Sequence, residues 1–305
     1  MADVLVIIGA GGMGEAIARR TGSGHRVLLS DFNEDLLSDS ARRMRDSGFD
    51  VETREVDVSS RDSVRDLARA AADLGPVTRV AHTAGLSPVQ APPPAILRVN
   101  LVGVAYSLEE FGQVVAPGGS AVVISSMGGA LNDFDPRTEQ DLRTLPADEL
   151  LSIPYLRERP DIESRAAYGF SKRANQLRVQ GAAGAWGARG ARVNTVSPGI
   201  ISTPMGQQEL AGVSGDSMRA MIENSATGRL GTTHDVADAV AFLFGPESTF
   251  VTGTDLLVDG GVVASIRTGA PVSAPSQRVD QRSVDEQVLN PATGCGRPSG
   301  RTFHD

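Results

Sequence analysis

The sequence has 305 residues, of which 40% are hydrophobic and 22% charged, with a formal net charge of −8. These values are typical of a globular protein and exclude a disordered chain, a collagen and a disulfide-stapled scaffold. The negative charge argues against general binding to nucleic acid or to an anionic membrane. No apolar run reaches the ~18–20 residues that a membrane span requires, and the start of the sequence lacks the basic segment of a signal peptide. Cys295 is the single cysteine, so we expect a cytoplasmic protein without internal disulfides.

Short β-branched runs alternate with helical patterns along most of the chain. Strands are expected at residues 4–8, 27–31, 51–58, 77–82, 120–125, 191–196 and 254–258. Helices are expected at residues 15–20, 34–46, 60–74, 95–115, 166–188 and 233–244. A strand–helix–strand order implies parallel crossovers. The pattern therefore predicts a single doubly wound α/β domain, with a mostly parallel sheet and helices on both faces.

Two segments depart from this alternation. Residues 131–164 are polar and acidic, and Asp135-Pro136 and Pro146 have the character of helix starts, which predicts a helical insertion. Its apolar residues need a surface to cover: Leu142, Leu145, Leu150, Leu151, Ile153 and Tyr155. A substrate pocket or a partner subunit is favoured equally over the chain's own core. Residues 265–305 are rich in Pro, Gly and Ser without an apolar period, which predicts a flexible tail after a domain over residues 1–264.

A glycine-rich turn follows the first expected strand. Gly9, Gly11 and Gly14 have the Gly-x-Gly-x-x-Gly spacing, which lets the backbone approach a pyrophosphate at a helix N-terminus. Asp31 ends the second expected strand, at about the 20-residue distance of the acid that binds adenosine ribose hydroxyls in Rossmann folds. Its carboxylate would repel a 2′-phosphate, so we predict NAD rather than NADP. The alternative is a structural turn and a solvated aspartate.

Tyr168 and Lys172 are four residues apart and hence share one helix face. Lys172 is the only lysine among 29 lysine and arginine residues, which suggests a position that needs a compact ammonium rather than a planar guanidinium. Such an ammonium, with a positive nicotinamide ring, would lower the pKa of Tyr168 from about 10 and make it a general acid–base. The alternative is a tyrosine packed on a helix beside a solvent-exposed lysine.

In order and combination, these motifs resemble the short-chain dehydrogenase/reductase family over about residues 3–264. The resemblance implies a set of cofactor-binding residues: Gly9, Gly11, Gly12, Met13, Gly14, Asp31, Asp57, Val58, Ala84, Gly85, Tyr168, Lys172, Pro198, Gly199, Ile200 and Thr203. Three features depart from the family pattern, and the long gap between Ser126 and Tyr168 is one of them. The threonine that usually begins the glycine motif is missing, and His82-Thr83 stands where the family usually has Asn-Asn.

The resemblance also implies catalytic roles. Tyr168 would exchange a proton with the substrate oxygen, and Lys172 would hold the nicotinamide ribose and lower the Tyr168 pKa. Ser126 would hydrogen-bond the substrate oxygen, although the neighbouring Ser125 remains an alternative. Asn100 would anchor a water of a proton relay, or would only cap or kink its helix.

The resemblance implies an NAD-dependent enzyme that moves a hydride between the nicotinamide and a secondary alcohol or ketone. The long segment between Ser126 and Tyr168 is similar to that of bacterial 3α-hydroxysteroid dehydrogenase/carbonyl reductases. The four histidines form no ligand cluster, so no metal is expected. The alternatives are a non-catalytic NAD-binding regulator and an enoyl reductase, which the Tyr-Lys spacing disfavours.

Family members usually pair subunits through the helix that carries the Tyr-Lys motif. An insertion just before that helix should obstruct or replace this pairing. We therefore expect a homodimer or homotetramer with an altered interface, and an insertion that lines one wall of the site.

Overall fold

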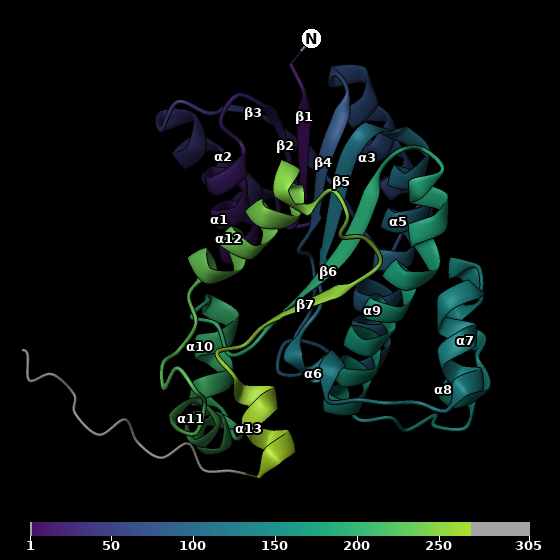
Figure 1. Cartoon of the computed structure of the whole chain (residues 1–305), viewed down its shortest axis with the longest axis vertical. Helices are drawn as coiled ribbons and strands as arrows, with labels where there is room; N and C mark the ends of the chain where they lie inside the picture. Colours follow the sequence, from purple (N-terminus) through teal and green to yellow (C-terminus); the bar gives the residue numbers. More distant parts are fainter. Residues whose placement is uncertain (1, 270–305) are drawn as a thin grey trace, which may run out of the picture. The chain divides into compact units, whose positions relative to one another are not determined.

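The computed structural model describes residues 2–269. Its sheet has seven strands in the order β3-β2-β1-β4-β5-β6-β7, and all neighbouring strands are parallel (Figure 1). The strands are β1 (Val4–Ile8), β2 (Arg26–Asp31), β3 (Asp50–Glu55), β4 (Val77–His82), β5 (Val115–Ile124), β6 (Arg192–Pro198) and β7 (Asp255–Val258). The strand order reverses between β1 and β4, so the carboxyl ends of these two strands border the crevice in which doubly wound sheets bind ligands. The predicted fold class is confirmed.

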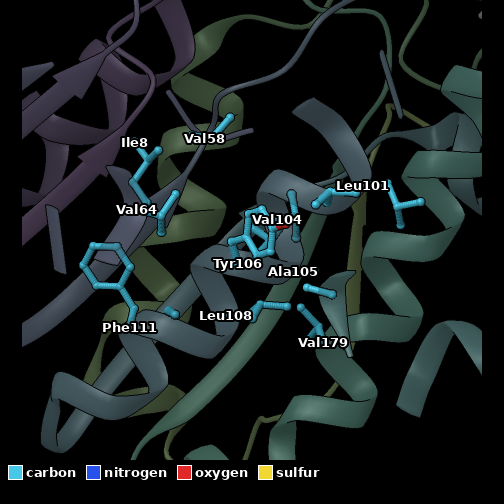
Figure 2. Close-up of a cluster of buried hydrophobic side chains, with 14 of the residues drawn as sticks. Ile8, Val58, Val64, Leu101, Val104, Ala105, Tyr106, Leu108, Phe111 and Val179 are labelled. Atoms are coloured by element: carbon cyan, nitrogen blue, oxygen red, sulfur yellow. The ribbon is translucent and has the colours of Figure 1, made fainter. Parts of the chain in front are cut away.

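Helices cover both faces of the sheet (Figure 1). One face is covered by α1 (Gly12–Thr21), α2 (Glu34–Asp46) and α12 (Thr233–Phe244), and the other by α3 (Arg61–Leu74), α5 (Gly103–Val114) and α9 (Ser164–Gly187). All five residues of β1 are buried because alternate side chains enter two different cores. Figure 2 shows part of the core between the sheet and helices α3, α5 and α9, which includes Ile8, Val64, Val104 and Phe111.

Several expected elements differ from the structure; for example, β5 begins at Val115 rather than at residue 120. The helix expected over 95–115 is divided into α4 (Pro93–Ile96), the π-helix η1 (Leu97–Val102) and α5. The strand expected over 51–58 ends at Glu55. Asp57 instead begins a turn, because its carboxylate accepts hydrogen bonds from the amide and the hydroxyl of Ser59.

The acidic segment after Ser126 is helical, as predicted. It contains α6 (Met127–Ala130), α7 (Pro136–Thr144), the 3₁₀-helix η2 (Ala147–Ser152) and α8 (Pro154–Arg157). The side chain of Asp135 caps α7 by accepting from the amides of Arg137 and Thr138. Pro146, the second expected helix start, is the N-cap residue of the 3₁₀-helix η2 rather than of an α-helix.

All but one of the six apolar residues of this insertion pack on the chain's own core, which corrects the favoured expectation; the exception, Leu151, is 38% exposed. Leu142 and Leu150 are fully buried and Ile153 is 2% exposed, within the core that includes α5 and α9. Figure 1 shows α7 and α8 on the side of α9 that faces away from the sheet. α7 approaches α9 closely because Gly181 has no side chain where the carbonyl of Arg143 lies.

Charged side chains also connect the insertion to the domain. Glu109 on α5 accepts from Arg178 on α9, from Arg61 on α3 and from the amide of Ala147 in η2. Glu139 on α7 forms an ion pair with Arg173 on α9. The Arg178 side chain is 8% exposed and that of Glu109 is 30% exposed, so this network extends from the protein interior to its surface.

Further helices lie beyond the carboxyl ends of the strands (Figure 1). They are α10 (Pro204–Ala211), α11 (Gly215–Glu223) and α13 (Val262–Thr268). The 3₁₀-helix η3 (Pro246–Ser248) instead lies at the amino ends of the strands, where Ser248 accepts from Arg192, the first residue of β6. Residues 265–268 belong to α13, so the expected tail begins too early. Residues 270–305 of that tail lie outside the described residues. Among residues 2–269, no helix is long and apolar enough to cross a membrane.

Candidate active site

The glycine-rich turn lies at the crevice and forms the N-terminus of α1. Gly11 occupies the N-cap position without a side-chain cap, so amides of the first turn point to the crevice. A Cβ on Gly9, whose φ is +106°, would lie 2.6 Å from the amide nitrogen of Ala84, and one on Gly14 would strike the carbonyl of Gly9. A Cβ on Gly11 would meet open space. The turn therefore fits a pyrophosphate, which approaches an uncapped helix N-terminus directly.

Thr83 contributes to this turn, although the sequence analysis did not select it. Its hydroxyl donates to the carbonyl of Gly9 at 2.8 Å and so connects the end of β4 to the turn after β1. The only sequence signal was the replacement of the family's asparagine at this position.

Asp31 ends β2 beside the same turn. Its Oδ2 accepts from the amide of Ala10 at 2.7 Å, and its Oδ1 accepts from the amide of Asn33 at 2.9 Å. Glu55 is its neighbour in the β2–β3 pairing. A hydrogen bond and repulsion from Glu34 raise the pKa of Glu55, which places a third carboxyl group nearby. This edge of the crevice is therefore negatively charged.

The other expected cofactor residues also lie at the carboxyl ends of the strands. Val58 packs against Gly103, and Thr203, the N-cap of α10, lies near Gly12. Met13 is partly buried against the core on the α1 side of the sheet. Pro198 ends β6.

Gly199 directly follows Pro198 and contacts Asp259. Gly199, Ile200 and Asp259 line a cavity of about 310 Å³. Tyr168 and Lys172 do not line this cavity.

The structure brings Ser126, Tyr168 and Lys172 together. Ser126 follows β5 and caps α6, where its hydroxyl accepts from the amide of Gly128 at 3.1 Å. A Cβ on Gly128 would lie 3.5 Å from Ser126 Oγ and 3.8 Å from Tyr168 Cε1, so both side chains lie beside this glycine. Lys172 Nζ is 5.7 Å from the centre of the Tyr168 ring.

Ser125 has a different environment from Ser126. It is 3% exposed, and its hydroxyl donates to the carbonyl of Lys172 at 2.7 Å. Ser125 therefore attaches α9 to the end of β5, whereas the partly buried Ser126 faces Tyr168. Of the two serines, Ser126 has the geometry to contact a substrate oxygen.

Asn100 lies in the π-helix η1 and is fully buried. Its side chain accepts from the amide of Leu86 at 2.8 Å and donates to the carbonyl of Leu86 at 2.9 Å. A Cβ on Gly85 would lie 3.3 Å from Asn100 Oδ1 and 3.6 Å from Lys172 Nζ. Asn100 thus approaches Lys172 across Gly85, and its amide fixes the loop after β4.

The pKa of Tyr168 differs from the sequence expectation. Burial raises it to about 12, although the hydrogen bond with Ser126 acts in the opposite direction. Burial also lowers the pKa of Lys172 to about 8, and its ammonium donates to the carbonyl of Ile124 at 3.0 Å. In the protein alone, desolvation of the phenolate therefore outweighs any stabilisation by Lys172.

Metal ligands do not gather in the described part of the chain. Residues 2–269 contain no group of three or more His, Cys, Asp or Glu side chains that could hold a metal ion.

A doubly wound sheet with an uncapped glycine turn and a Ser-Tyr-Lys set at its crevice defines the class of Rossmann-fold oxidoreductases. A family model described as Enoyl-(Acyl carrier protein) reductase matches residues 9–133 and 147–263. The chain is 46% identical to the short-chain dehydrogenase/reductase bsc3 of Alternaria brassicicola, over 86% of this chain and 96% of that protein. The chain belongs to the short-chain dehydrogenase/reductase family.

A further relative agrees with this assignment, and a solved structure shares the fold. The cis-4-hydroxycyclohexanecarboxylate dehydrogenase of Sinomonas cyclohexanicum is 30% identical, over 86% of this chain and 96% of that protein. A crystal structure of an actinorhodin polyketide ketoreductase with NADPH is 24% identical and has a TM-score of 0.68, covering 86% of this chain and 97% of that one. The family match omits residues 134–146, which contain α7.

Proposed function

We propose that this protein is an NAD(H)-dependent oxidoreductase that interconverts a secondary alcohol and a ketone. The observation that carries the proposal is the grouping of Ser126, Tyr168 and Lys172 beside the uncapped glycine turn. A bound nicotinamide dinucleotide would supply the hydride acceptor or donor. Gly11 and Gly12 would hold its pyrophosphate at the N-terminus of α1.

In this proposal Tyr168 moves the proton. During ketone reduction its hydroxyl donates to the substrate oxygen, and during alcohol oxidation its phenolate accepts the proton. Ser126 hydrogen-bonds the same substrate oxygen and opposes the effect of burial on the Tyr168 pKa. Lys172 holds the ribose and presents a positive charge to the phenol. Asn100 fixes the loop beside Lys172 and anchors the relay water.

The negative edge at Asp31 supports NAD over NADP. A 2′-phosphate at this edge would face the carboxylate of Asp31, with Glu55 on the adjacent strand. The 2′-phosphate of NADP carries a charge of about −1.5 to −2 at neutral pH, so its repulsion from these carboxylates disfavours NADP.

Replacement of Asp31 by serine is expected to reduce this preference. We expect the wild-type protein to bind NAD at least about tenfold more tightly than NADP, a difference of about 1.4 kcal/mol. The Asp31→Ser variant should lose most of it because the repelling charge is gone. Fluorescence titration of both cofactors measures the ratio, with Asp35→Ser on α2 as a charge-matched control. Equal or tighter binding of NADP by the wild-type protein would contradict the assignment.

Lys172→Arg is expected to impair turnover strongly although the charge is kept. Lys172 is 6% exposed and its ammonium donates to the carbonyl of Ile124. A guanidinium is larger and planar and cannot occupy this position without displacing its neighbours. Steady-state kinetics should show a loss of kcat for Lys172→Arg. Arg173→Lys, the reverse exchange at the next residue, is the control and should keep kcat. Normal turnover of Lys172→Arg would exclude a specific role for the ammonium.

The substrate proposed is a hydrophobic carbonyl compound or secondary alcohol, such as a ring alcohol or a steroid-like ketone. The name of the Sinomonas relative describes a ring alcohol, and the long segment before Tyr168 is similar to that of hydroxysteroid dehydrogenases. A screen of cyclic ketones and steroids with NADH and NADPH tests this proposal. No turnover with any member, in a protein that binds NAD, would favour the non-catalytic regulator. The Tyr-Lys spacing still disfavours an enoyl reductase.

The insertion bears on how subunits could pair. Phe134 and Tyr155 pack on Phe170, which lies about 200° around α9 from Tyr168. These two rings therefore do not form the expected wall of the site. Because α7 covers the outer side of α9, we propose a homodimer or homotetramer whose interface avoids that side. A cytoplasmic location and the absence of a metal stay predictions.

A further inference from the structure

Three buried polar side-chain atoms of His82 on β4 and Asn175 on α9 have no hydrogen-bond partner within the described residues. They are Nε2 of His82 and both side-chain amide atoms of Asn175. His82 is 2% exposed and Asn175 is fully buried. Buried polar atoms are usually paired with protein groups or with ordered water. The proposed chemistry of Tyr168 and Lys172 gives these atoms no role.

The two residues lie at the same level of the fold. His82 pairs with Val123 across β4 and β5, and Lys172 Nζ bonds the carbonyl of Ile124, the next residue of β5. Helix α9 follows β5 and leads into the parallel strand β6, so it runs antiparallel to β5. Asn175 is about one turn after Lys172, which places it level with Val123 and hence with His82.

The hydrogen bonds of His82 indicate which ring nitrogen is free. Ser107 Oγ donates to the carbonyl of Gly103, so it accepts from Nδ1 of His82 at 3.0 Å. Nε2 is then an unpaired acceptor. Burial, followed by the charge of Lys172, lowers the pKa of His82 to about 3, against a smaller opposite effect of the Ala84 backbone. His82 is therefore neutral and adds no positive charge beside Lys172.

No carboxylate faces Lys172 from the described elements around it. The titratable groups facing it are Tyr168 on the same helix and His82 on β4, while η1 presents the uncharged Asn100 and β5 the carbonyl of Ile124. Burial is the only cause of the lowered Lys172 pKa. The ammonium therefore depends on neutral dipoles for its stability.

We propose that His82 and Asn175 are positioning residues that hold buried water beneath Lys172. Nε2 of His82 and the carboxamide oxygen of Asn175 accept from this water, whose own oxygen accepts from the ammonium. The water thereby replaces a carboxylate in keeping Lys172 protonated and oriented. The inference rests on the proposed function only in that it concerns the lysine assigned there to the ribose.

The single lysine allows a direct test without turnover. Protein labelled with ¹³C and ¹⁵N lysine carries one lysine side-chain signal, whose pH titration gives the Lys172 pKa in the absence of cofactor. We expect a wild-type value near 8 and a fall of about one unit in His82→Leu and in Asn175→Leu, because an acceptor for the charged form is lost. His82→Asn, which keeps an acceptor, should stay close to wild type. His25→Leu, at the opposite end of the sheet, is the matched control.

An unchanged Lys172 pKa in folded His82→Leu and Asn175→Leu would overturn the proposal. So would a high-resolution crystal structure in which the Asn175 amide donates directly to His82 with no water between them; ordered water bonded to Nε2 would support it. The crystal structure needs only the wild-type protein, so the test survives if a leucine variant does not fold. Because neither measurement requires activity, failure of the proposed oxidoreductase function would leave both results readable.

Discussion

Tyr168→Phe is expected to lower kcat by about 10²–10⁴-fold while NAD binding stays within about twofold of wild type. The substitution removes one oxygen, the only group in the proposal that exchanges a proton with the substrate. Ser126 and Lys172 keep their positions, because their bonds to Gly128 and Ile124 do not involve the phenol. Steady-state kinetics with any substrate found in the screen, together with cofactor titration, separate the two effects.

Tyr155→Phe is the matched control for this experiment. Tyr155 is stacked on Phe170 with ring centres 4.8 Å apart and belongs to the insertion. The same loss of one hydroxyl there should leave kcat within about twofold. Near-normal turnover of Tyr168→Phe would refute the mechanism, whereas loss of NAD binding would show that the phenol acts on cofactor binding instead.

Glu109→Ala is expected to lower the free energy of unfolding by about 2–4 kcal/mol, the largest stability effect predicted for a single surface-accessible carboxylate here. Its removal leaves Arg178 without its counter-ion, and that side chain is only 8% exposed. Burial already lowers the pKa of Arg178, and Glu109 is the group that opposes this shift. The amide of Ala147 in η2 would lose its acceptor as well.

The neighbouring carboxylate supplies the control. Glu110 pairs with Arg61 and Arg65, whose side chains are 26% and 35% exposed and stay accessible to water. Glu110→Ala should therefore cost less than about 1 kcal/mol. Urea unfolding of both variants gives the comparison. Equal losses would mean that the insertion is not held through Glu109.

The same contacts change what deletion of the insertion should do. Removing residues 134–160 would take away Leu142, Leu150 and Ile153, which are buried in the domain core. It would also expose Arg178 and leave the outer side of α9 uncovered. We expect an aggregating or unfolded product rather than a simpler enzyme, because a large apolar surface would face water. A soluble variant with an unchanged oligomeric mass would show that the insertion is dispensable.

Local sequence patterns determined the alternation of strands and helices, because period, glycine turns and capping residues act within a few residues. Thus β1, α12 and the Asp135 cap of α7 lie where the residues predict them. The spacing of Tyr168 and Lys172 likewise determined one shared helix face. Helices α10, α11 and α13 were not predicted, because their short segments have no strong period and depend on packing beyond the sheet.

Only the tertiary structure decided the features that depend on distant partners. It distinguished Ser126 from Ser125, because the hydroxyl of Ser125 is bound to a carbonyl on α9. It placed the insertion on the chain's own core, where Gly181 leaves room for the carbonyl of Arg143 and Arg178 donates to the carbonyl of Leu145 at the end of α7. It also raises the Tyr168 pKa in the protein alone, whereas the predicted lowering includes the charge of the nicotinamide ring. Burial is a property of the whole fold, and no spacing between two residues reveals how far each is removed from water.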